Sequence, residues 1–256
     1  MLRPEVVLTA VAVACLGLPW LLQFVVAPAR MRARSWQAAN PVYSPEDEDG
    51  LPTAARRAAD DLRALGFRDR GTWRHDGSAQ ATGRIILLEH PRTRDVAKVM
   101  VVTTNRRRSV TFVFQTRFAD ETEAATTNTR HAVGFPHLPG QTVAWLPEVR
   151  EAGPLYRVHA QLRDAIGGAS ERVGIGPDAA EYLRDGSARS LANWVANGYY
   201  ALDADRGVVR PTWKGATLIT WRLLWPLKPL YRARRRRATA RLLERLGISA
   251  EAGTGG

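Results

Sequence analysis

The sequence predicts an α+β domain in which an antiparallel sheet of about four to six strands is covered by helices, behind an N-terminal transmembrane helix. Three observations lead to this fold class. The first is an uncharged apolar run from Val6 to Ala27. The second is a central block of short segments rich in β-branched residues and separated by polar turns. The third is that segments with apolar residues at helical spacing lie on both sides of this block.

The run from Val6 to Ala27 is long enough for a membrane-spanning helix, which needs about 20 apolar residues. A cleaved signal peptide is the alternative, but the apolar part of such peptides is usually only about 7–15 residues long. Arg30, Arg32 and Arg34 follow the run, and basic residues near a span tend to stay in the cytoplasm. We therefore expect a single-pass membrane protein with its C-terminal domain in the cytoplasm.

Shifts in composition divide the chain into four parts. Residues 1–29 form the expected anchor, and residues 30–51 form a linker that is first basic and then acidic. Residues 52–211 contain the α+β domain, and residues 212–256 form a C-terminal arm rich in tryptophan and arginine. The acidic cluster Glu46–Asp49 is interpreted as part of a solvated linker, since such clusters need no partner.

Charge and cysteine usage limit the function classes. The formal net charge is +12, and Cys15, inside the apolar run, is the only cysteine. The domain therefore has no internal disulfide, no thiol nucleophile and no cysteine-based zinc site. A basic surface facing an anionic leaflet accounts for the charge, and a protein partner is left open. Nucleic acid is the rival partner for such a surface, but it is not the one that we expect.

The expected elements begin with a helix over Leu51–Leu65, in which Ala55, Ala58 and Leu62 recur at helical spacing. The strands that follow are expected at Arg84–Glu89, Val96–Thr104, Val110–Phe118, Ala124–Thr129 and Thr142–Leu146. Val110–Phe118 alternates most clearly, because its phenylalanines fall on one face and its polar residues on the other.

The second half of the chain is predicted to be mainly helical. Pro154 and Pro177 each open a helix, because proline suits the first helical position. A tight hairpin is expected between Tyr199–Leu202 and Val208–Arg210. A basic helix over Arg232–Leu246 ends the predicted structure.

Candidate catalytic or metal-ligating residues are few. They are His131, His137, His159 and Asp120. Catalytic zinc commonly takes three protein ligands, and Glu148 lies among the histidines in the sequence. Their spacing matches no known ligand motif, so neither a metal site nor a cofactor is predicted. A membrane-associated hydrolase that uses these loop residues is the second function hypothesis. Convergence of the candidates in one concave pocket would support it.

The C-terminal arm supplies the candidate membrane-contacting residues. Tryptophan suits the headgroup boundary, and long basic side chains reach lipid phosphates from there. A helix packed into the core is the alternative for this apolar stretch. The candidates are Trp213, Trp221, Arg222, Trp225, Lys228, Arg232, Arg234, Arg235, Arg236 and Arg237. The first function hypothesis is therefore a membrane-anchored binding or scaffold module at the cytoplasmic leaflet.

Overall fold

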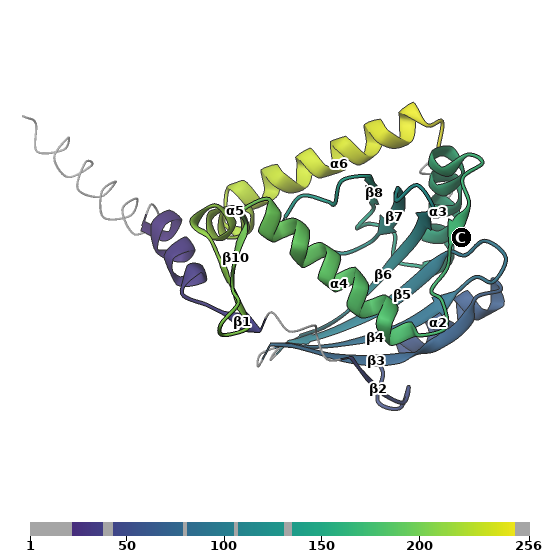
Figure 1. Cartoon of the computed structure of the whole chain (residues 1–256). Coiled ribbons are helices and arrows are strands. Elements are labelled where there is room, and N and C mark those ends of the chain that lie inside the picture. Colours follow the sequence, from purple (N-terminus) through teal and green to yellow (C-terminus); the bar gives the residue numbers. More distant parts are fainter. Residues whose placement is uncertain (1–21, 38–42, 79–80, 105–106, 131–134, 249–256) are drawn as a thin grey trace, which may run out of the picture. The chain divides into compact units, whose positions relative to one another are not determined.

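The computed structural model describes residues 22–37, 43–78, 81–104, 107–130 and 135–248 (Figure 1). Most of the predicted span, Val6–Ala27, therefore lies outside the described residues, although residues 22–32 are helical and are called the N-terminal helix below. Within the described ranges, no helix combines the length and the apolar character needed to cross a membrane. The span itself stays a prediction.

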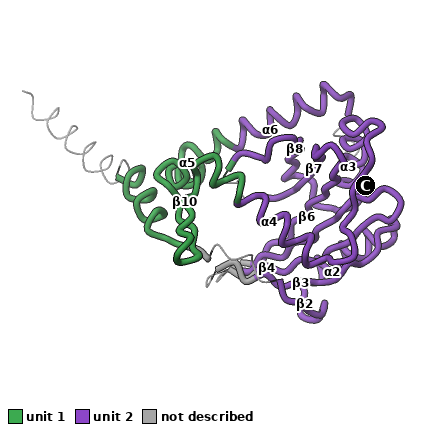
Figure 2. The backbone as a smooth tube through the Cα atoms, in the orientation of Figure 1, with its two compact units in different colours: residues 1–39, 133–135, 192–231 green, residues 40–132, 136–191, 232–256 purple. Residues whose placement is uncertain are grey.

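The chain folds into two compact units, which Figure 2 distinguishes by colour. Unit 1 contains residues 1–39, 133–135 and 192–231, and unit 2 contains residues 40–132, 136–191 and 232–256. Two helices run from one unit into the other, α4 (Ala179–Ala196) and α6 (Leu227–Arg245).

Unit 2 is built on an eight-stranded sheet, where about four to six strands were expected. Its order is β2 (Tyr43–Pro45), β3 (Arg68–Ser78), β4 (Ala81–Glu89), β5 (Val96–Thr104), β6 (Arg107–Phe118), β7 (Glu123–Thr127) and β8 (Gln141–Trp145), with β9 (Arg172–Val173) paired to β6. Neighbouring strands are antiparallel except β7 and β8, which are parallel. The α+β class and the mostly antiparallel sheet are confirmed.

The prediction missed strands for two physical reasons. β2 and β9 are three and two residues long, which is too short for an alternating pattern. β3 is long, but it is rich in charged residues, and its register shifts between Asp69 and Gly71 and again between Asp76 and Ser78. Gly71 has φ 109°, a conformation that favours glycine. These irregularities interrupt the two-residue period by which strands are recognised.

The sheet of unit 2 has a buried apolar face on each side. On one side, α2 (Thr53–Ala64) and α3 (Ala152–Gly167) pack on Phe112, Phe114 and Phe118, and the core includes Leu62 and Leu155. These phenylalanines share one face, as their alternation predicted. The opposite face has a smaller core. There the first part of α4 covers β4 and β5 through the residues Ala179, Tyr182, Leu183, Ile85, Leu87 and Val96.

Unit 1 contains a three-stranded sheet in the order β1 (Trp36–Gln37), β11 (Val208–Pro211), β10 (Tyr200–Asp203). β10 and β11 form the predicted hairpin. α5 (Trp213–Leu223) follows β11 at once, and the Thr212 side chain caps it by accepting a hydrogen bond from Gly215 N at 3.1 Å. Glycine is required at 215, since a Cβ there would lie 2.0 Å from the Tyr199 carbonyl oxygen.

The N-terminal helix packs against α5 within unit 1. The indole Nε1 of Trp221 donates a hydrogen bond to the Phe24 carbonyl oxygen at 2.9 Å, and the two rings meet edge to face at 6.0 Å. Phe24 belongs to the predicted membrane span. The end of that apolar run is therefore held against α5.

Candidate functional site

The structure places the candidate catalytic residues in different environments. His131 lies outside the described residues. Asp120 is exposed on the turn after β6, where hydrogen bonds from the side chain and backbone N–H of Thr122 lower its pKa. His137 is exposed, with its Nε2 3.1 Å from Arg235 Nη2, and Glu148 is also exposed. No group of three histidine, cysteine or acidic side chains in the described ranges could hold a metal ion.

His159 is fully buried on α3. Its Nε2 lies 2.9 Å from Thr116 Oγ1, and its Nδ1 lies 3.2 Å from Thr126 Oγ1. Thr116 donates its one hydroxyl proton to Asp95 Oδ1 at 2.6 Å, so His159 Nε2 must be the donor to Thr116. Nδ1 then accepts from Thr126. Burial lowers the pKa of His159 to about 4, so the ring is neutral near pH 7.

Asp95 is the centre of this buried polar network. Its Oδ2 accepts hydrogen bonds from Tyr156 at 2.9 Å and from Thr93 at 2.7 Å, and it forms an ion pair with Arg163. Asp95 and His159 are fully buried, and Arg163 is 6% exposed. A substrate has no route to groups enclosed in this way. The network therefore joins α3 to the sheet and stabilises the fold, and His159 is not available for catalysis.

A second polar cluster lies beneath α4 on the opposite face. Lys98 Nζ donates a hydrogen bond to Gln115 Oε1 at 2.8 Å and lies 5.1 Å from the ring centroid of Tyr182. Burial lowers the pKa of Lys98 to about 8 and raises the pKa of Tyr182. Such a lysine is suited to base or nucleophile chemistry, but this one is already paired and packed under an aromatic ring. Lys98 was not among the candidate residues, although a lone lysine in the apolar strand β5 could have indicated a buried charge.

Large exposed apolar side chains are concentrated in unit 1. Among the described residues, only Leu65 and Val173 of this kind belong to unit 2. Those of unit 1 are Leu22, Val25, Val26, Leu202, Trp213, Trp221, Leu223, Trp225 and Leu230. The three tryptophans are 50%, 42% and 71% exposed in the same order. These values exclude the alternative in which the three tryptophans pack in the core.

Basic side chains are interleaved with these aromatic groups. The described part of unit 1 contains eight basic residues and two acidic ones, and both acids are in the segment from β10 to the hairpin turn. The guanidinium carbon of Arg32 lies 5.0 Å from the ring centroid of Trp213, and that of Arg222 lies 4.5 Å from Tyr231. Unit 1 therefore presents a surface that is both apolar and strongly positive.

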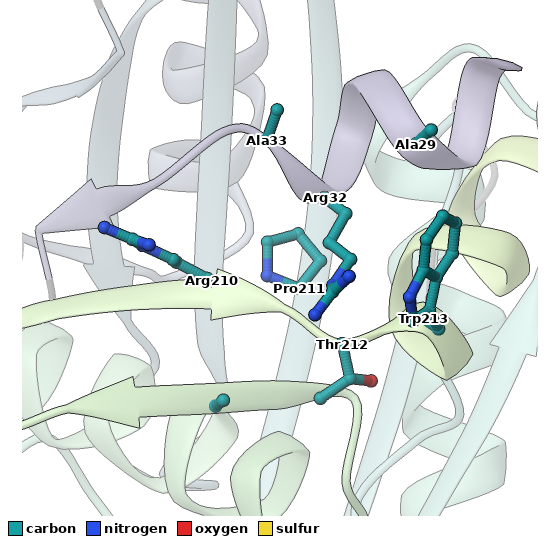
Figure 3. Close-up of a pocket in the computed structure, with 8 residues that line it drawn as sticks. Ala29, Arg32, Ala33, Arg210, Pro211, Thr212 and Trp213 are labelled. Atoms are coloured by element: carbon teal, nitrogen blue, oxygen red, sulfur yellow. The ribbon is translucent and has the colours of Figure 1, made fainter.

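A pocket of about 520 Å³ opens on this surface (Figure 3). Its lining residues are Ala29, Arg32, Ala33, Ala201, Arg210, Pro211, Thr212 and Trp213. In Figure 3 the Arg32 side chain lies between Pro211 and Trp213, whereas Arg210 extends on the other side of Pro211. His137, His159, Asp120 and Glu148 do not line this pocket. The pocket could not be predicted from local patterns, because its two halves lie about 170 residues apart in the sequence.

The predicted basic helix is α6, and its arginines fall into two groups. Some contact other residues of unit 2, and the others are exposed. Arg232 Nη2 donates to the Arg130 carbonyl oxygen at 3.1 Å, and the Arg235 guanidinium carbon lies 5.0 Å from the Trp145 ring centroid. Leu243 of the same helix is buried in the core. This part of α6 is thus attached to unit 2. Three further arginines of the helix are exposed, and these are Arg234, Arg236 and Arg237.

Comparisons of the chain with protein-family models, with curated proteins and with solved structures found no match.

Proposed function

We propose that the protein is a membrane-anchored α+β binding or scaffold module, and that unit 1 docks it on the anionic cytoplasmic leaflet. One observation supports this function above all others. Among the described residues, the large exposed apolar side chains gather in unit 1, together with basic residues and with the N-terminal helix. An exposed surface rich in tryptophan and arginine has the composition of a membrane interface.

The contact between Trp221 and Phe24 supports the same placement. Phe24 lies near the end of the predicted span, and its carbonyl oxygen accepts the indole hydrogen bond of Trp221. If residues 6–27 cross the bilayer, α5 must lie at the end of that helix. Trp213, Trp221 and Trp225 then lie near the headgroups, where indole rings are favoured. Arg222 and Lys228 lie beside them in the sequence and have side chains long enough to reach lipid phosphates.

The exposed arginines of α6 add electrostatic attraction. Each basic residue near an anionic leaflet contributes about 1 kcal/mol. Of the five arginines between Arg232 and Arg237, two are engaged by unit 2, so Arg234, Arg236 and Arg237 contribute about 3 kcal/mol together before screening. The attraction should therefore weaken as the salt concentration rises.

Two rival functions have less support. The hydrolase hypothesis required candidate residues to converge in a concave pocket, and the described candidates His137, His159 and Asp120 do not line the pocket in Figure 3. Nucleic-acid binding would use the basic residues, but it would leave the exposed Leu22, Val25 and Leu223 without a role. A protein partner bound on unit 2 is compatible with the docking that we propose.

Tryptophan quenching tests the docking. The full chain is placed in nanodiscs of phosphatidylcholine, alone or mixed with phosphatidylglycerol, that carry lipids brominated near the headgroup. The fluorescence of Trp225 is obtained as the difference between the full chain and Trp225→Phe. The difference between the full chain and Trp73→Phe gives the fluorescence of Trp73 in unit 2, which is the control. We expect stronger quenching of Trp225 in the anionic discs, and less of it when Arg234, Arg236 and Arg237 are replaced by glutamine. Equal quenching of Trp225 in both kinds of disc would overturn the proposal.

A further inference from the structure

We propose that the pocket of unit 1 binds the phosphate-bearing headgroup of an anionic phospholipid, and that Arg32 and Arg210 supply its positive charge. This inference rests on the proposed docking of unit 1 and names the residues that select the lipid. The inference rests on three properties of the pocket, which are its depth relative to the predicted span, its charge and its lining residues.

The depth follows from the N-terminal helix. The predicted span ends at Ala27, and Arg32 comes five residues later in the same continuous helix. At 1.5 Å of rise per residue, Arg32 lies about 7–8 Å beyond the end of the span. The headgroup layer of one leaflet is about 5–7 Å thick, since a bilayer of about 40–45 Å has a core of about 30 Å. A span that ends at Ala27 therefore puts the backbone of Arg32 at the outer edge of the headgroup layer, within reach of the phosphates for a long basic side chain.

None of the residues that line the pocket is acidic. Arg32 stacks over Trp213, and within the described ranges neither Arg32 nor the exposed Arg210 forms an ion pair with a carboxylate. The two acids of the described part of unit 1, Asp203 and Asp205, do not line the pocket, and Asp203 accepts a hydrogen bond from Arg206 N at 3.2 Å. A planar guanidinium binds two phosphate oxygens at once, so these arginines suit a phosphate group.

The lining favours a lipid over a small anion. Ala29, Ala33, Ala201, Pro211 and the Trp213 ring give the pocket apolar walls next to the two guanidinium groups. A volume of about 520 Å³ falls within the usual range of ligand pockets, about 300–1,000 Å³. Inorganic phosphate would leave most of this space and its apolar walls unused. A glycerophosphate headgroup with its first methylene groups matches both the charge and the walls.

The experiment titrates the full chain, purified in an uncharged detergent, with dihexanoyl phosphatidylglycerol and counts bound lipid by native mass spectrometry. Dihexanoyl phosphatidylcholine and inorganic phosphate are titrated separately and as competitors. The test variant is Arg32→Gln with Arg210→Gln. Arg206→Gln is the matched control, since it removes an exposed arginine of the same hairpin that does not line the pocket. Because all three arginines are exposed, both variants should fold, which circular dichroism checks.

We expect one phosphatidylglycerol per chain, tighter than phosphatidylcholine, and a dissociation constant raised about thirtyfold in the double variant. That factor corresponds to about 2 kcal/mol for two basic residues near an anionic headgroup. Arg206→Gln should change the constant by less than a factor of three. Equal losses of phosphatidylglycerol affinity in the two variants would show that the lipid is attracted to the surface in general, and would overturn the proposed lipid site. Complete displacement of the lipid by millimolar phosphate would show a site for small anions and would also overturn it.

The quenching experiment separates this inference from the docking proposal. Suppose that Trp225 of the natural chain is quenched more strongly in anionic discs, but that the double variant and Arg206→Gln bind phosphatidylglycerol equally well. This result would refute lipid binding in the pocket and leave the docking proposal intact. Selective loss of lipid binding in the double variant, without any quenching of Trp225 in anionic discs, would uphold the pocket and refute the docking.

Discussion

The neutral, buried His159 makes the stability of the protein depend on pH. Its pKa is lowered to about 4, whereas a histidine in the unfolded chain has a pKa of about 6.5. Between about pH 4 and pH 6.5 the imidazole of His159 is protonated in the unfolded state but not in the folded state. Stability is therefore highest above pH 6.5 and falls as the pH decreases toward 4.

The size of the effect follows from the two pKa values. Over the whole window the loss is about 3 kcal/mol, and between pH 7.5 and pH 5 it is about 2 kcal/mol. For a chain of this size, about 2 kcal/mol corresponds to a fall of roughly 4–8 °C in Tm. Asp120 and Asp164 have lowered pKa values, so their contributions are lost only at more acidic pH and do not enter this comparison.

The assay compares the full chain with His159→Gln by thermal unfolding in detergent at pH 7.5, 6 and 5. The variant is less stable at every pH because it loses the contacts to Thr116 and Thr126, but it lacks the titrating ring. The other four histidines, His75, His90, His131 and His137, are present in both proteins, so their titration cancels in the difference. The natural chain should lose about 2 kcal/mol more than the variant between pH 7.5 and 5. Identical losses would refute the buried, neutral state of His159.

Two further pairs of variants test the packing of unit 2 by urea unfolding. Asp95→Asn should cost about 3–5 kcal/mol, because it breaks the buried ion pair and leaves the Arg163 guanidinium with only the exposed carboxylate of Asp164, whereas the exposed Asp185→Asn should cost about 0–1 kcal/mol. Equal costs would contradict the buried ion pair. Gly167→Ala should destabilise by about 1–3 kcal/mol, since its Cβ would lie 1.9 Å from the Phe118 ring. Gly186→Ala, inside α4 with no atom within 4 Å of its Cβ apart from the backbone of its own helix, should instead stabilise by about 0.5–1 kcal/mol, and a loss there would contradict the open space around it.

Local patterns predicted the elements better than they predicted the sites. The alternation in Val110–Phe118 identified β6 and its buried face, because one side of that strand meets the core. β3 was missed because its charged residues and register shifts hide the same period. The stripe on α3 placed His159 near the core, but its neutral state depends on Thr116 and Thr126 from other strands. A contact between distant strands leaves no trace in local spacing.

The C-terminal arm shows what composition alone cannot distinguish. A run of tryptophans is compatible with a core helix or with a surface, and only the exposed fractions of Trp213, Trp221 and Trp225 separate the two. The arginine run likewise appeared uniform, yet Arg235 stacks on Trp145 while Arg236 is exposed. The partners of these side chains come from segments far away in the sequence. Charge density therefore predicted the sign of the surface but not which arginines are available.

Hydrogen exchange of the full chain in nanodiscs tests the proposed docking most directly. Peptides that cover α5 and residues 224–231 are compared between discs of phosphatidylcholine and discs that also contain phosphatidylglycerol, with α3 of unit 2 as the internal control. We expect slower exchange of these peptides in the anionic discs at low salt, no such difference at 1 M salt, and unchanged exchange of α3. Equal exchange of α5 in both kinds of disc at low salt would contradict the docking of unit 1 on an anionic leaflet.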